Sequence, residues 1–283
     1  MVLESLINPK KAEGHPLEMF VIGLVYSSVA IFLSLWIFRD YASLVMVFLT
    51  VFASVPLVYS VISIEEEKDS ESESESFLLK EHSKAVMVFV FLFLGNLASF
   101  TFWYVFLPEG IIQTLFSVQT ETIRSINAGV VGFSVGGDFL MQIFSNNVKV
   151  MIFCILFAFL FGAGAIFILT WNATVIAAAI GSFIRSNIAA YAETAGFDKI
   201  TGYFHASSSG LLRYIIHGIP EITAYFVAGL AGGIISVAVI RHDFGTQKFK
   251  KILMDSIDLI VIAILLLVVA AMIEVFVTPR LFY

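Results

Sequence analysis

The run SIDLIVIAILLLVVAAMIEVFVT, residues 256–278, has the length and composition of a helix that crosses a lipid bilayer. Such a helix needs about 20 apolar residues, because each residue adds about 1.5 Å and the hydrocarbon core is about 30 Å thick. The whole chain shares this character, since 59% of its 283 residues are hydrophobic and only 13% are charged. That composition is unsuited to a soluble globular protein, so the sequence predicts an all-α, polytopic membrane protein.

Other apolar runs extend this interpretation to a bundle of six to seven membrane segments. The run 173–184 is the uncertain one, because it has fewer than 20 residues before Arg185 and is either a short crossing helix or a re-entrant one. The predicted segments are Met19–Phe38, Tyr41–Ile64, Lys84–Leu107, Val148–Thr170, Ala173–Ile184, Pro220–Ile240 and Ser256–Thr278.

Polar residues suggest where these segments begin and end. The stretch from Pro108 to Asn147 is mixed, so we expect one or two short amphipathic helices at the membrane surface. Ser145-Asn146-Asn147 is expected to cap the next helix, and Trp171-Asn172 to end it. Pro220 suits the first position of a helix, with Glu221 stabilised by the positive helix end.

Three regions follow from the charge distribution. Residues 1–64 form an N-terminal membrane hairpin, residues 65–83 an acidic disordered loop, and residues 84–283 the main membrane domain. The acidic loop is either a plain connector or a docking site for a basic protein partner, and the lack of a basic patch disfavours nucleic acid. Lys248, Lys250 and Lys251 beside the last segment predict a multi-pass protein of the cell membrane with a cytoplasmic N-terminus.

His217 and Glu221 are the strongest candidates for a site inside the membrane. Ionisable groups are costly there and are often functional. Four residues apart on a helix, the two side chains share one face, where they hydrogen-bond to each other, carry a proton or an ion, or bind a metal. Two ligands are too few for zinc, so the metal remains unknown and no cofactor is predicted. Further candidates for the same polar site are Asn172, Arg213 and Asn147.

Small residues mark predicted helix contacts. Gly162 and Gly164 are expected to let a second helix approach closely. After Glu221 a ridge of small residues indicates either packing within the chain or the contact surface of a homodimer. The ridge consists of Ala224, Ala228, Gly229, Gly232 and Gly233.

Motifs of membrane enzymes are mostly lacking from the sequence. It contains neither His-Glu-x-x-His nor a Gly-x-x-x-x-Gly-Lys-Ser/Thr phosphate loop. We therefore expect a protein without catalytic activity, and a membrane-embedded hydrolase is only a distant alternative.

Several strings together resemble the stage II sporulation protein M family. The most specific is His217-Gly-Ile-Pro-Glu221, accompanied by Ser145-Asn146-Asn147, Gly162-Ala-Gly164 and Trp171-Asn172. The resemblance covers about Lys84 to Phe282, which leaves the first hairpin and the acidic loop as additions. In spore-forming bacteria it implies a multi-spanning scaffold that recruits cell-wall hydrolases.

The expected function is therefore that of an integral membrane scaffold or assembly component that works as a homodimer within the lipid bilayer. The alternative is a transporter or channel subunit, in which His217 and Glu221 face an aqueous path with Asn172 and Arg213 nearby.

Overall fold

The computed structural model describes residues 15–71, 75–130, 137–161, 163–190, 197–241, 245–278 and 280. These residues form helices joined by short turns, and no strand occurs among them, which confirms the predicted all-α class. The elements are α3 (Pro16–Ile37), η1 (Arg39–Tyr41), α4 (Ala42–Glu71), α5 (Glu75–Phe106), α6 (Glu109–Leu115), α7 (Ser117–Val130), α8 (Gly137–Phe161), α9 (Ala165–Ala190), α10 (Phe197–Arg241), α11 (Gln247–Met272) and the π-helical turn η2 (Ile273–Val277).

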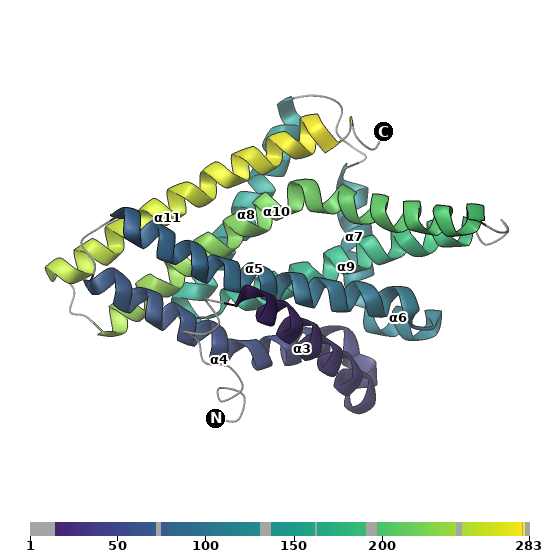
Figure 1. Cartoon of the computed structure of the whole chain (residues 1–283), viewed down its shortest axis with the longest axis horizontal. Helices are drawn as coiled ribbons and strands as arrows, with labels where there is room; N and C mark the ends of the chain where they lie inside the picture. The colour runs from purple at the N-terminus through teal and green to yellow at the C-terminus, as the bar shows by residue number, and fades with distance from the viewer. Residues whose placement is uncertain are drawn as a thin grey trace.

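Seven of the described helices are long and apolar enough to cross a membrane. The segment Gly218–Arg241 of α10 is the most enclosed, with 83% of its most apolar stretch buried, against 22% for the segments in α8 and α11. In Figure 1, α5 and α10 run through the middle, with α3 and α4 on one side and α11 on the other. The outer faces of α8 and α11 are thus left for lipid.

Two glycines let α3 and α5 touch backbone to backbone. A Cβ atom on Gly95 would lie 2.0 Å from the carbonyl oxygen of Phe20, and one on Gly23 would lie 2.3 Å from that of Leu92. In lipid, the hydrophobic effect does not drive two apolar helices together. Close van der Waals packing of this kind stabilises their association instead. The N-terminal hairpin is therefore packed tightly against the rest of the bundle.

Polar contacts show that α3 and α5 run in the same direction. Gly23 lies beside Asn96, and five residues later Ser28 Oγ lies 2.9 Å from Ser99 Oγ. Trp103 Nε1 donates a hydrogen bond of 3.0 Å to Ser28 Oγ. Both helices therefore begin at the same end of the bundle.

The boundary between α8 and α9 differs from the prediction. Ser145-Asn146-Asn147 lies inside α8 instead of capping it, and Trp171-Asn172 lies inside α9 instead of ending a helix. Asn172 Nδ2 donates to the carbonyl oxygen of Ile168, so its amide is satisfied on its own helix. Ending a helix inside lipid would leave backbone groups without partners, which favours one continuous helix. The stretch 173–184 is thus part of the full-length segment Ala165–Ser186.

The prediction that Pro220 begins a helix is also wrong. Pro220 lies inside α10, which starts at Phe197 and has 45 residues. Proline is tolerated within a transmembrane helix where neighbouring helices and local adjustments satisfy the freed backbone groups. Figure 1 shows α10 changing direction part-way along its length.

The acidic stretch 65–83 is helical where it is described, and not the predicted disordered loop. Helix α4 continues to Glu71, and α5 begins at Glu75. The physical reason is a set of ion pairs between the two helices, whose geometry is given below. Figure 1 places the junction of α4 and α5 at the same end of the molecule as the start of α11.

Two short helices, α6 and α7, follow Pro108, as predicted, but the stretch up to Asn147 is not all of this kind, because the long helix α8 already begins at Gly137. The start of α7 does not lie flat on the surface, however. Gln119 is fully buried, where its Oε1 accepts a hydrogen bond of 2.7 Å from Ser43 Oγ, and its Nε2 donates to Thr174 Oγ1 at 3.2 Å. This amide links α7 to both α4 and α9.

Replacing Gln119 by methionine is expected to lower the free energy of unfolding by about 1–3 kcal/mol, because buried polar partners lose their hydrogen bonds. Thermal unfolding in detergent measures the loss. Gln113 is exposed, so Gln113→Met is the matched control and should change little. Equal effects of the two variants would contradict the structural role of Gln119.

Candidate functional site

Glu221 is the predicted site residue whose contacts are best defined. It lies on α10, and its Oε1 accepts a hydrogen bond of 2.7 Å from the Tyr225 hydroxyl, one helical turn later. Tyr225 is only 1% exposed. A tyrosine hydroxyl at this depth needs an acceptor, and the carboxylate provides one.

The other predicted site residues are only partly brought together. Asn147 on α8 is buried, and its Nδ2 has no hydrogen-bond partner among the described residues. Asn172 uses its amide on the backbone of α9 and makes no described contact with Glu221. Arg213 and His217 belong to α10, but their side chains lie outside the described residues.

Glu274 is a neighbour of Glu221 that the sequence reasoning missed. It lies in η2, which packs against α10, and its carboxyl group interacts electrostatically with that of Glu221. The sequence did contain a usable indication, because Glu274 is an acidic residue deep within an apolar run. Ionisable residues within a membrane segment are costly and often functional, and this argument, which identified Glu221 as a candidate, applies equally to Glu274.

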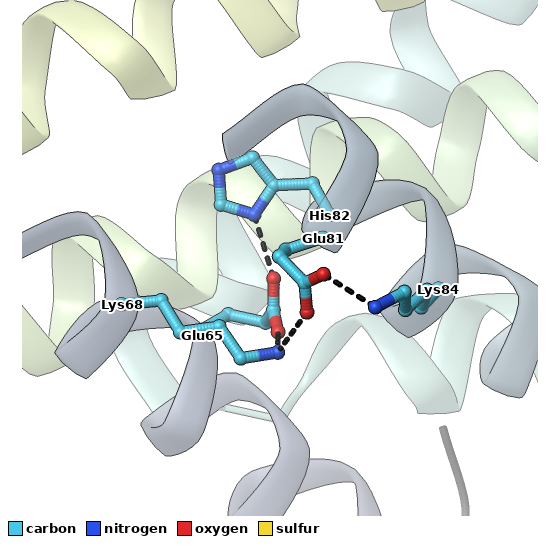
Figure 2. Close-up of polar contacts among 5 residues, drawn as sticks. All are labelled: Glu65, Lys68, Glu81, His82 and Lys84. Atoms are coloured by element: carbon cyan, nitrogen blue, oxygen red, sulfur yellow. Dashed lines mark hydrogen bonds and ion pairs between the residues drawn. The ribbon is translucent and has the colours of Figure 1, made fainter. Parts of the chain in front are cut away.

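A second polar cluster joins α4 to α5 at the end of the bundle (Figure 2). Glu65 is fully buried, and its two carboxylate oxygens lie 2.7 Å from His82 Nδ1 and 2.6 Å from Lys68 Nζ. Lys68 also lies 3.1 Å from Glu81, which in turn pairs with Lys84. We call these five residues the hairpin cluster.

The hairpin cluster balances its own charge. Two carboxylates face two ammonium groups, and His82 donates a hydrogen bond from Nδ1 to the carboxylate of Glu65, which can only accept. Burying charges is costly unless each one is paired and hydrogen-bonded. The cluster therefore holds two helices in one geometry, and the sequence indicated it only through the spacing of Glu65 with Lys68 and of Glu81 with Lys84.

Arginines connect further helix ends. Next to the hairpin cluster, Arg241 at the end of α10 lies 2.7 Å from the buried carboxylate of Glu66. At the opposite end, Arg185 of α9 donates to the carbonyl oxygens of Tyr104 and Val105 in the last turn of α5 and to that of Leu107, just after α5, at 2.9 Å, and it pairs with Glu109 at 2.9 Å. A cation there compensates the negative end of the α5 dipole.

The small-residue ridge of α10 is used within the chain. Ala224 and Ala228 are fully buried, and Gly229 and Gly233 are buried as well. A Cβ atom on Gly229 would lie 2.8 Å from Ala165 Cβ, and one on Gly232 would lie 2.7 Å from the carbonyl oxygen of Ile155. The ridge thus packs against α8 and α9 of the same chain. This is the first of the two expected uses of the ridge, packing within the chain, and it leaves no room for a second copy at this surface.

The predicted close approach at the start of α9 is present at Gly164. A Cβ atom there would lie 2.2 Å from the carbonyl oxygen of Phe157, so the glycine lets α9 fold back against α8. Gly162 lies outside the described residues. Among those described, no three histidine, cysteine or acidic side chains are grouped so as to hold a metal ion.

Comparisons with known proteins place the chain in a family. Neither a curated protein nor a solved structure matches it. The sequence model described as "Stage II sporulation protein M" matches residues 89–279, which are more than half of the chain and include the Glu221 region. With its seven apolar helices, the chain is a multi-spanning membrane protein that belongs to the stage II sporulation protein M family.

Proposed function

We propose that this protein is a scaffold without catalytic activity, which presents the helical hairpin of α4 and α5 to a basic protein partner. The observation that carries the proposal is the hairpin cluster, because it holds the projecting ends of two helices in one fixed arrangement. Holding two helices together before a partner arrives avoids part of the entropy cost of binding.

The negative charge of the hairpin supports a partner with a basic surface. Residues 65–75 contain seven acidic residues and one lysine. Glu65 and Glu66 are neutralised within the protein, whereas the sequence places further acidic residues around the junction of α4 and α5. Complementary charge steers partners together and fixes their orientation. With the N-terminus in the cytoplasm, this docking surface faces the cytoplasm too, because α3 and α5 begin at the same end.

A homodimer is the second part of the proposal. Since the ridge of α10 is covered within the chain, the dimer forms through helices whose outer faces are open, and α8 and α11 are the least buried of these. Mass photometry of the protein in lipid nanodiscs measures the stoichiometry. A strictly monomeric protein over the accessible concentration range would contradict this part.

The docking proposal predicts that neutralising Glu71, Glu73 and Glu75 to glutamine removes a stoichiometric, salt-sensitive protein complex from solubilised membranes. The matched control neutralises three acidic residues elsewhere, Asp40→Asn, Glu121→Gln and Asp258→Asn, so the net charge changes equally. Quantitative cross-linking mass spectrometry of both variants provides the comparison.

Two results would overturn the scaffold proposal. One is an unchanged complex in the hairpin variant at the stoichiometry of the wild type. The other is sustained flux of an ion or solute through the purified protein in liposomes, which would support the transporter alternative.

A further inference from the structure

Helix α8 carries polar side chains on the face that points away from the bundle. Gln142, Ser145, Asn146 and Lys149 are all exposed, and none of them forms a hydrogen bond or an ion pair with another residue in the part of the chain that the structure describes. Steps of three and four residues place these four side chains on one side of the helix. We call them the polar row.

The polar row lies on the opposite side of α8 from its inward face. The inward face is buried and consists of Asn147, Met151, Cys154 and Ala158. At about 100° per residue, the two sets of side chains are roughly half a turn apart. Further along, the outward face continues with the exposed apolar side chains of Phe153, Leu156 and Leu160. One face of α8 is therefore polar in its first half and apolar in its second.

The polar row lies within the part of α8 that crosses the membrane. The candidate span Leu140–Phe161 has 22 residues, and Lys149 is the tenth of them. At about 1.5 Å per residue this span is about 33 Å long, so all of it is needed to cross a hydrocarbon core of about 30 Å. The next helix, α9, already begins at Ala165 and returns through the membrane. Lipid against the polar row would therefore leave a lysine and two amides in hydrocarbon, which is costly.

A second copy of α8 has the chemistry to cover this face. Amide and hydroxyl side chains both donate and accept hydrogen bonds, so Asn146 and its neighbours can pair with the same residue types on another helix. The ammonium group of Lys149 needs acceptors, which amide oxygens provide, and its flexible stem lets it reach them. Because every copy inserts in the same orientation, a two-fold axis along the membrane normal places the two α8 helices in parallel. Each half of the face then meets its own equivalent.

We propose that two copies of this chain associate through the outward face of α8, with the two polar rows hydrogen-bonded to each other and the apolar halves packed together. This inference rests on the homodimer of the proposed function and specifies which helix forms its contact. The other open helix, α11, has only apolar residues among its exposed positions from Val261 to Met272, and lipid covers these without cost. The polar row makes α8, and not α11, the helix that needs a partner.

Disulfide cross-linking in native membranes tests the contact. Under mild oxidation, Ser145→Cys or Asn146→Cys should give a covalent dimer, because equivalent residues lie close to the two-fold axis. The wild type is the matched control, since its Cys154 is on the same helix but on the buried inward face and should give no dimer. Leu265→Cys, at an exposed position on α11, should give none either.

Dimer affinity gives a second readout. Asn146→Leu removes polar contacts between the helices and makes the monomer more compatible with lipid, so the dimer dissociation constant in membranes should rise about tenfold. Single-molecule photobleaching of the labelled protein over a range of protein-to-lipid ratios measures this constant. Gln113→Leu removes another exposed amide, which bonds only to Glu109 on its own helix, and should leave the constant unchanged.

The outcomes separate this contact from the homodimer itself. A protein that is dimeric by mass photometry but cross-links through Leu265→Cys, or through neither position of α8, would overturn the α8 contact and leave the homodimer standing. An unchanged dissociation constant in Asn146→Leu would also overturn it. A strictly monomeric protein would overturn both the contact and the homodimer.

Discussion

Replacing Gly95 by alanine should lower the free energy of unfolding by about 3 kcal/mol or more, at the upper end of what overpacking costs. The new Cβ atom would lie 2.0 Å from a backbone oxygen of α3, so a whole helix must move, not just a flexible side chain. The same substitution at Gly218 meets nothing within 4 Å. Gly218→Ala should instead stabilise α10 by roughly 0.5–1 kcal/mol, because alanine loses less backbone entropy in a helix.

A disulfide can report the α3–α5 contact directly. Ser28 and Ser99 face each other with their hydroxyl oxygens 2.9 Å apart, so cysteines at both positions should cross-link readily. The native Cys154 is buried and would not compete. We expect a high cross-linking yield in the Gly218→Ala background and a low one with Gly95→Ala. Equal yields and equal unfolding temperatures in the two backgrounds would show that α3 does not approach α5 as closely as described.

Replacing Glu65 by leucine should cost about 3–5 kcal/mol of stability, because it removes a buried carboxylate that bonds both to Lys68 and to the buried His82. Glu65 is fully buried, so solvent cannot compensate for the loss. Chemical unfolding of the purified protein in detergent measures the difference. Glu121→Leu is the matched control: Glu121 pairs with Arg124 at 3.8 Å with both side chains 75% exposed, and exposed pairs contribute little.

A triple variant separates charge from packing. In Glu65→Leu/Lys68→Met/His82→Leu the two polar groups that bonded to Glu65 are apolar as well, so most of the stability lost in the single variant should return. Glu81 keeps Lys84 as its partner. A triple variant as unstable as Glu65→Leu would mean that the hairpin cluster contributes through shape and not through paired charge.

Length and apolar composition in the sequence were enough to determine that this chain is a helical membrane bundle and roughly where its helices lie. These properties are local, since about 20 apolar residues cross a bilayer whatever their neighbours are. The small-residue ridge of α10 was recognisable for a similar reason, because close helix packing requires small side chains at regular spacing. The family string around Glu221 was likewise readable from the chain alone.

Helix boundaries depended on tertiary structure. Trp171-Asn172 and Pro220 have the local character of helix ends, yet α9 and α10 continue through them. In lipid, an interrupted helix leaves backbone groups without partners, and this cost exceeds the local preferences of the residues. The acidic stretch became helical for a different reason, namely ion pairs between residues of α4 and α5 that only the folded hairpin brings together.

The partners of the polar groups were also decided only in three dimensions. Glu65 lies 2.7 Å from His82, which is 17 residues away in the sequence, and the turn η2, which contains Glu274, packs against α10. Periodicity within one helix carries no information about which face of another helix lies opposite. The sequence thus determined the membrane fold and marked Glu221, whereas only the packing of α10 against the end of α11 brought the turn that carries Glu274 to α10, because the facing surfaces of two helices are not encoded in the periodicity of either one.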